Sequence, residues 1–139
     1  LDRFVLFLEI LKLISVSKSV ALSNFVYTKK YSDVEGKRMR NVFDFTIENA
    51  HQKITLTDIA SVANMTKNAF CKYFKKRTNK TYIGFLTELR IENACKLLKT
   101  NNDLSINEIA YKSGFNNISN FNRKFKEIKN ITPISYRNL

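Results

Sequence analysis

The sequence has few residues that break helices and few that bind metals. It contains three glycines, one proline, two cysteines, one histidine and no tryptophan among 139 residues. Long helices joined by short loops are therefore favoured, which predicts an all-α fold. Cys71, Cys95 and His51 match no familiar spacing for a disulfide framework or a metal site. We expect reduced thiols, no metal and no cofactor.

The residue patterns that mark enzyme active sites are also missing. The sequence has no Gly-rich phosphate loop, no cluster of carboxylates and no Cys and His pair at a spacing used in catalysis. Such a chain lacks the acids, bases and nucleophiles of the common reaction classes. We therefore expect a binding protein and not an enzyme.

Residues 1–14 form an apolar run that does not predict a membrane span. Glu9 and Lys12 interrupt the run, and it is shorter than the roughly 20 residues that a span requires. A buried or interface helix fits it better, and the polar residues 16–35 fit a linker. Because the chain does not begin with Met, we expect it to be a fragment whose first helix contacted a preceding domain.

Basic side chains dominate the charge of the chain. The net charge is +12 and the pI is about 9.8. Residues 1–35 hold five basic and four acidic side chains, so nearly all of the excess falls in residues 36–139. This distribution indicates an acidic polymer or surface as the partner.

One pattern occurs twice, about fifty residues apart. Residues 56–75 read LTDIASVANMTKNAFCKYFK and residues 106–126 read INEIAYKSGFNNISNFNRKFK. Each copy has an Ile-Ala pair, a turn residue four positions after the Ala, and a Phe-Lys ending. This order predicts two helix-turn-helix units, homeodomain-like three-helix subdomains, over 55–76 and 105–128. Two such units suggest two contacts with duplex DNA.

Local sequence rules support both units. Thr55-x-x-Asp58 and Ser105-x-x-Glu108 have the form of capping boxes at helix starts. Asn64 and Gly114 tolerate the positive φ that the tight turn needs. The other matched positions are small residues that let helices cross closely and phenylalanines that face inward at i, i+4 spacing: Ala60, Ala110, Phe70, Phe74, Phe121 and Phe125.

The two units differ in length by one residue. Ala60 to Phe70 spans ten positions, whereas Ala110 to Phe121 spans eleven. The extra residue is expected at the turn or at the start of the second recognition helix. We therefore expect an asymmetric, non-palindromic DNA site.

A long helix is predicted between the units, over residues 81–99. About 17 helical residues at 1.5 Å each give a rod of roughly 26 Å, which can set two recognition helices about one DNA turn, roughly 34 Å, apart. Its apolar residues must also contribute to the cores of both units, and Arg90 within it is expected to be structural. A helix over 37–50 should brace the first unit.

Helical spacing leaves one face of each recognition helix for DNA, with Phe70, Tyr73 and Phe74 facing inward on the first. Arg123 is the best candidate for reading guanine, and Ile118 can contact a thymine methyl group. The expected base contacts are Lys67, Asn68, Cys71, Lys72, Asn117, Ile118, Ser119, Asn122 and Arg123. The expected phosphate contacts are Thr66, Lys75, Lys76, Lys124 and Lys126.

The run from about Arg38 to Arg137 resembles the DNA-binding domain of AraC/XylS-family bacterial transcription regulators. The resemblance rests on Gly114-Phe115, on Ser119-x-Phe121-x-Arg123-x-Phe125-Lys126 and on Pro133-x-x-Tyr136-Arg137. Two departures are Asn130, where the family commonly has Gly, and Lys72, where Arg is common. The second departure puts a bidentate guanine contact by the first unit in doubt.

The resemblance implies a domain organisation and a set of partners. Residues 36–139 would form the DNA-binding domain, and residues 1–35 the C-terminal helix of an upstream sensing or dimerisation domain with its linker. The expected function is a sequence-specific, double-stranded DNA-binding transcription regulator in the cytoplasm. RNA polymerase and a second copy of the chain, bound through the upstream domain, are further expected partners, and no membrane is.

Two other readings of the sequence are open. An all-α protein–protein interaction module without specific DNA binding is supported by the apolar segment 4–14. RNA binding is open to any basic domain, but the exposed aromatic platforms of single-strand readers are missing, since nearly every phenylalanine has an inward position.

Overall fold

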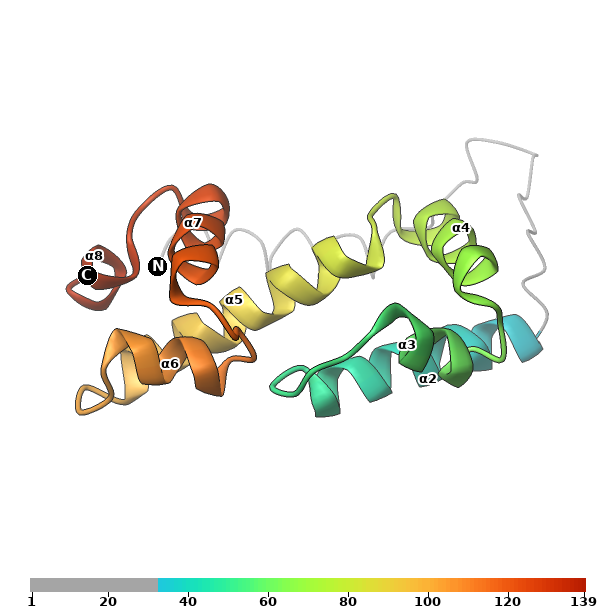
Figure 1. Cartoon of the computed structure of the whole chain (residues 1–139), viewed down its shortest axis with the longest axis horizontal. Helices are drawn as coiled ribbons and strands as arrows, with labels where there is room; N and C mark the ends of the chain where they lie inside the picture. Colours follow the sequence, from blue (N-terminus) through green and yellow to red (C-terminus); the bar gives the residue numbers. More distant parts are fainter. Residues whose placement is uncertain (1–32) are drawn as a thin grey trace, which may run out of the picture. The chain divides into compact units, whose positions relative to one another are not determined.

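The computed structural model of the chain describes residues 33–139. Every described element lies within one compact unit of the chain, which ends at Leu139. These elements are all helices: α2 (Asp33–Asn49), α3 (Leu56–Val62), α4 (Lys67–Thr78), α5 (Tyr82–Thr100), α6 (Ile106–Lys112), α7 (Ile118–Lys129) and α8 (Pro133–Arg137) (Figure 1). The all-α prediction is confirmed for this part, and the predicted helix near the N-terminus lies outside it.

Helix α2 begins earlier than the sequence predicts. It starts at Asp33, so residues 33–35, which we assigned to the linker, are helical. Contacts from α4 explain the difference. The Tyr73 hydroxyl donates to the Glu35 carbonyl oxygen at 3.3 Å, and Arg77 Nη2 lies 2.7 Å from Glu35 Oε2. These tertiary contacts stabilise a first helical turn that has little apolar periodicity of its own.

The first subdomain consists of α2, α3, α4 and the beginning of α5. Its core contains Val42, Phe70, Phe74 and Tyr82, all nearly inaccessible to solvent. The rings of Phe74 and Tyr82 meet edge to face, with centroids 5.5 Å apart. Buried Thr46 donates its hydroxyl to the Val42 carbonyl oxygen at 2.6 Å and lies 3.0 Å from the Tyr82 hydroxyl. This core therefore satisfies its polar atoms internally.

The second subdomain consists of the remainder of α5 with α6, α7 and α8. Ile91, Leu98, Ile109, Phe121 and Phe125 are fully buried in its core. Helix α5 contributes to both cores, through Tyr82 and Leu86 to the first and through Ile91, Ala94, Cys95 and Leu98 to the second. Its 19 residues span roughly 28 Å. The predicted helix between the units is thus both a spacer and a core element.

The two turns have the predicted backbone geometry. Asn64 has a φ of 52° and Gly114 a φ of 92°. After each turn the backbone of an apolar residue is hydrogen-bonded to the first helix of its unit. Met65 N–H donates to the Ala60 carbonyl oxygen, and Phe115 N–H donates to the Ala110 carbonyl oxygen. The second recognition helix then begins one residue later, so the extra residue of the second unit is the exposed Asn116.

Arg90 joins the two subdomains. Its Nε donates to the Ala50 carbonyl oxygen and its Nη2 to that of Gln52, both at 2.7 Å, beyond the end of α2. Gly114 of the second turn lies close to both partners of the hydrogen bond between Arg90 Nε and the Ala50 oxygen. A Cβ at Gly114 would stand 2.3 Å from the Ala50 oxygen and 2.7 Å from Arg90 Nε. Burial lowers the pKa of the Arg90 guanidinium. The predicted structural role of Arg90 is therefore to fix the end of α2 against α5 and the second turn.

Candidate nucleic-acid interface

The first recognition helix, α4, is fixed by its buried face and its caps. Thr66 caps its start by accepting the Ala69 N–H, and Asn79, with a φ of 56°, ends it. Phe70 and Phe74 are fully buried. Tyr73, predicted to face inward, is only partly buried. Its hydroxyl donates to the Glu35 carbonyl oxygen of α2, and the Arg77 guanidinium lies 4.7 Å from its ring centroid.

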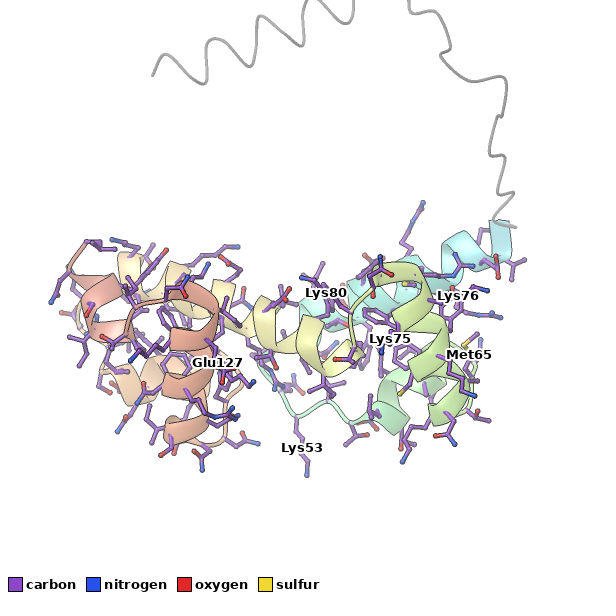
Figure 2. All side chains as sticks on the ribbon, turned by 90° about the horizontal axis from the view of Figure 1, so that it is seen from above. Lys53, Met65, Lys75, Lys76, Lys80 and Glu127 are labelled. Atoms are coloured by element: carbon purple, nitrogen blue, oxygen red, sulfur yellow. The ribbon has the colours of Figure 1, made fainter. Side chains whose placement is uncertain are left out.

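The opposite face of α4 is exposed and positively charged. Four lysines of α4 are exposed, and none forms a hydrogen bond or ion pair with another residue between 33 and 139: Lys67, Lys72, Lys75 and Lys76. Asn68 is exposed beside them. Figure 2 shows Lys75 and Lys76 on α4. Asn68, Lys72, Lys75 and Lys76 therefore share one accessible, cationic surface, and Lys67 lies in the first turn of the helix.

Cys71 lies at the edge of this surface. It is a free, partly buried thiol, and with Lys72 and Lys75 it lines a cavity of about 340 Å³. The apolar side of this cavity comes from the starts of α3 and α5, including Tyr82 and Ile83. Cys71 is therefore less accessible than the fully outward position that we predicted.

Two of the predicted DNA-contact residues of the second recognition helix, α7, stabilise the helix and its packing. Asn117 is the N-cap residue, and its Oδ1 accepts the Asn120 N–H at 2.9 Å. Ile118 is partly buried and packs against the second core. Both side chains thus have roles in the fold that helical spacing did not reveal. Ser119, Asn122 and Arg123 are exposed, as predicted.

An ion-pair cluster occupies the exposed face of α7. Arg123 Nη1 lies 3.0 Å from Glu127 Oε1, and Lys124 Nζ lies 2.7 Å from Glu127 Oε2. Arg123 Nη2 also donates to Asn120 Oδ1 at 2.9 Å. The hydrogen bond from Lys124, followed by the nearby positive charges, lowers the pKa of the Glu127 carboxyl group. We call Arg123, Lys124 and Glu127 the Glu127 cluster.

The predicted phosphate contacts are distributed over both recognition helices. Lys126 is exposed, whereas Lys124 is partly buried and lies in the Glu127 cluster. Lys129, in the last turn of α7, pairs with Glu92 of α5. Sequence reasoning missed Glu127, although its i, i+4 spacing from Arg123 is the spacing of a helical ion pair.

Two findings concern membranes and metal ions. No helix among residues 33–139 is long and apolar enough to cross a membrane. The same residues contain no group of three or more His, Cys, Asp or Glu side chains that could hold a metal ion. Cys95 is buried, as a small core residue would be, and burial raises the pKa of its thiol.

Comparisons with known proteins agree with this arrangement. A family model described as a helix-turn-helix domain matches residues 59–139. The chain is 30% identical over 123 residues to the uncharacterized HTH-type transcriptional regulator YdeC of Bacillus subtilis (strain 168). That match covers 88% of this chain but 42% of the relative, so the chain spans less than half of that protein's length.

Solved structures show the same fold. The DNA-binding domain of AdpA, a global transcriptional factor crystallised with a target DNA, superposes with a TM-score of 0.68 at 25% identity, covering 73% of this chain and 90% of that one. The C-terminal domain of the two-component response regulator yesN from Fusobacterium nucleatum gives a TM-score of 0.68 at 27% identity, covering 73% of this chain and 98% of that one.

Proposed function

Because this chain belongs to the family of AraC-type helix-turn-helix domains, we propose that it is the sequence-specific DNA-binding region of a transcription regulator. In this proposal α4 and α7 enter successive major-groove segments of one duplex. The observation that carries it is the shared construction of the two helices. Each follows a tight turn, buries a Phe pair and presents charged side chains away from its core.

The placement of α4 and α7 on α5 fits this mode of binding. In Figure 1 α4 lies beside the N-terminal end of α5, and α7 lies above its other half. A rigid helix of roughly 28 Å between two cores holds the recognition helices at a fixed separation. A fixed separation near one DNA turn selects two groove segments on one face of the duplex.

The exposed side chains divide by chemistry into two groups. Asn68, Lys72, Asn122 and Arg123 have the donors and acceptors that read base edges, and Lys67 and Ser119 stand beside them. Lys75, Lys76, Lys124 and Lys126 carry compact charges suited to phosphates, and the N–H groups at the start of α4, beside Thr66, suit an anion. Three further predicted contacts would bind DNA in addition to a structural role. Asn117 caps α7, Ile118 packs against the second core, and Cys71 lines the cavity beside α4.

The extra residue Asn116 makes the two turns unequal, so the proposed site is asymmetric. The lysine at position 72 and the arginine at position 123 occupy matched places, two residues after the first buried Phe of each recognition helix. An arginine can form a bidentate contact with guanine, whereas a lysine acts as a point charge. We therefore assign the stricter base reading to α7.

The rest of the regulator is proposed from the resemblance and from the length of the relatives. Residues 1–35 would end an upstream sensing or dimerisation domain, through which two copies would associate. RNA polymerase would be a further partner, and the protein would act in the cytoplasm without catalysing a reaction. The region from 36 to 139 would bind DNA without these parts.

The proposal is tested by titrating labelled duplex DNA, single-stranded DNA and duplex RNA with the protein at several salt concentrations. We expect tightest binding to duplex DNA, with an affinity that falls steeply as salt rises because lysines release counterions from phosphates. Salt-insensitive binding, or none, would favour a protein–protein interaction module. Preference for RNA would contradict the assignment of α4 and α7 to the DNA major groove.

A further inference from the structure

The basic side chains of the two recognition helices differ in whether they form ion pairs. On α4, Lys72, Lys75 and Lys76 are exposed and form no ion pair within residues 33–139. On α7, Arg123 and Lys124 share one carboxylate, that of Glu127. The two helices can be aligned on their buried Phe pairs, and Lys76 of α4 then corresponds to Glu127 of α7. The carboxylate that pairs the cations of α7 thus stands where α4 has a lysine.

The carboxylate of Glu127 occupies both cations at once. Its Oε1 pairs with Arg123 at 3.0 Å and its Oε2 with Lys124 at 2.7 Å. The Arg123 side chain is 60% exposed and that of Glu127 46%, so both are accessible to DNA. Any phosphate or base that binds Arg123 through the same guanidinium nitrogen must compete with Glu127.

The strengths of the competing contacts decide where Arg123 binds. Exposed ion pairs and single phosphate contacts are both weak, so a random duplex has little advantage over Glu127. A bidentate contact with guanine is stronger by a factor of about ten or more. A cognate base would therefore displace Glu127 from Arg123, whereas a random duplex would leave the pair intact.

We propose that Glu127 is a specificity-determining residue that withholds Arg123 and Lys124 from DNA phosphates until a cognate base edge displaces it. The proposal rests on the DNA-binding function proposed above and deepens it. In this mechanism α4 supplies affinity for any duplex through unpaired lysines, while α7 contributes to affinity only at the correct sequence. Discrimination is gained by weakening nonspecific binding, with no new contact to the cognate site.

The chain contains a matched control for Glu127. Glu88 of α5 is exposed to a similar extent, 43%, and pairs with Lys80 at 2.5 Å. Glu88 and Glu127 line the same groove, of about 370 Å³, between α5 and α7. Figure 2 shows Glu127 on α7 and Lys80 before α5. Glu88→Gln removes the same charge from the same groove and leaves the cations of α7 paired.

The test measures the Kd of wild type, Glu127→Gln and Glu88→Gln for a selected cognate duplex and for a random-sequence duplex. We expect Glu127→Gln to tighten random-duplex binding about threefold beyond the effect of Glu88→Gln, the size of one exposed ion pair. Its salt slope on random DNA should steepen by about one to two, since two cations become free for phosphates. Cognate binding should change less, so the ratio of the two affinities falls.

A second variant set isolates the partners of Glu127. In an Arg123→Ala, Lys124→Ala background no cation of the Glu127 cluster remains, so Glu127→Gln should act like Glu88→Gln. All the substituted side chains are at least one-third exposed, and circular dichroism verifies that each variant is folded.

Three results would overturn the proposal. Equal effects of Glu127→Gln and Glu88→Gln would show that Glu127 acts only by adding negative charge to the protein, and not by pairing with Arg123 and Lys124. Weaker cognate binding with unchanged random binding would show that Glu127 orients Arg123 toward the base. Persistence of the threefold effect in the doubly substituted background would exclude Arg123 and Lys124 as its targets. If the wild type instead fails to prefer any duplex, the proposed function itself fails, which the wild-type titration reveals separately.

Discussion

Arg123 and Lys72 stand at matched positions on α7 and α4, yet their surroundings differ. Arg123 bonds to Glu127 and Asn120, whereas Lys72 forms no ion pair within the described region and lines a cavity beside Cys71. A guanidinium can bind one guanine through two hydrogen bonds once it leaves Glu127, whereas an unpaired ammonium suits any phosphate. At the scale of single residues, the two helices are therefore fitted to different tasks.

Removing Arg123 should reduce discrimination more than general affinity. Arg123→Ala is expected to cost about 1–3 kcal/mol at a cognate site and to relax preference at one base pair. Lys75→Ala is the matched control, since it removes a cation from α4 and should weaken all sequences alike while lowering the salt slope by about 1. Competition titrations with single-base variants of the site measure both effects. Equal losses on cognate and random DNA from Arg123→Ala would refute its assignment.

The capping box of α6 predicts a pH dependence of stability. The backbone N–H and hydroxyl of Ser105 donate to Glu108 Oε2 at 2.8 and 2.7 Å, and these bonds lower the pKa of the Glu108 carboxyl group. A carboxyl group with a lowered folded-state pKa stabilises the protein above its unfolded pKa, near 4.3. That stabilisation is lost as the pH falls through the folded value.

Urea unfolding at a series of acidic pH values tests this dependence. Glu108→Gln should make the free energy of unfolding fall less steeply as the pH drops from about 5. Ser105→Ala should flatten the curve only in part, because the backbone N–H of residue 105 still donates. An unchanged slope in Glu108→Gln would show that the capping box does not contribute to acid sensitivity.

Single residues also show where sequence reasoning stopped. The capping boxes, the positive φ of Asn64 and Gly114, and the buried Phe pairs all follow from local chemistry, and the structure confirms them. The cap formed by Asn117 and the cluster around Glu127 depend on which rotamers neighbouring side chains adopt. Helical spacing gives the face of a residue but not the partner of its side chain.

The elements differ in how far local sequence determines them. Helices α3 and α6 start where the predicted capping boxes place them, because Thr55 and Ser105 cap their first turns. Helix α2 does not start where predicted, since its first turn is stabilised by contacts with Tyr73 and Arg77, about forty residues away. Long-range contacts of this kind leave no periodic signal in the sequence.

Two glycine substitutions should have opposite effects on stability. Gly36 lies in α2, and a Cβ there would meet no atom within 4 Å, so Gly36→Ala should stabilise the protein by about 0.5–1 kcal/mol. Gly114 has a positive φ, and its Cβ would stand 2.3 Å from the Ala50 oxygen. Gly114→Ala should therefore destabilise it by at least about 2 kcal/mol. Thermal and urea unfolding of both variants measure the signs, and a neutral Gly114→Ala would refute the close approach at this turn.

The separation of the recognition helices is a property of the whole domain. Helix α5 contributes side chains to both cores, and Arg90 at its centre binds the carbonyl oxygens that follow α2. The position of Gly114 against Ala50 adds a contact between the second turn and the first subdomain. The length of the spacer could be predicted from the sequence, but this junction could not, because it joins residues 50, 90 and 114.

Loss of the Arg90 side chain should loosen that separation. Arg90→Ala removes both hydrogen bonds to the loop after α2 and should lower the free energy of unfolding by about 2 kcal/mol or more. It should also allow binding to sites whose two sequence blocks are one base pair closer or farther apart. Lys96→Ala, on the exposed side of α5, is the control. If Arg90→Ala retains the wild-type spacing preference, the junction does not set the geometry of binding.

The central claim is that two unequal recognition helices read one asymmetric site. Selection of bound sequences from a random duplex library, by the wild-type protein, tests it most directly. We predict two enriched blocks with centres about one helical turn apart, unrelated by a two-fold axis, with the sharper preference in the block that Arg123→Ala relaxes. Absence of enrichment, a single block or a palindrome would contradict the account.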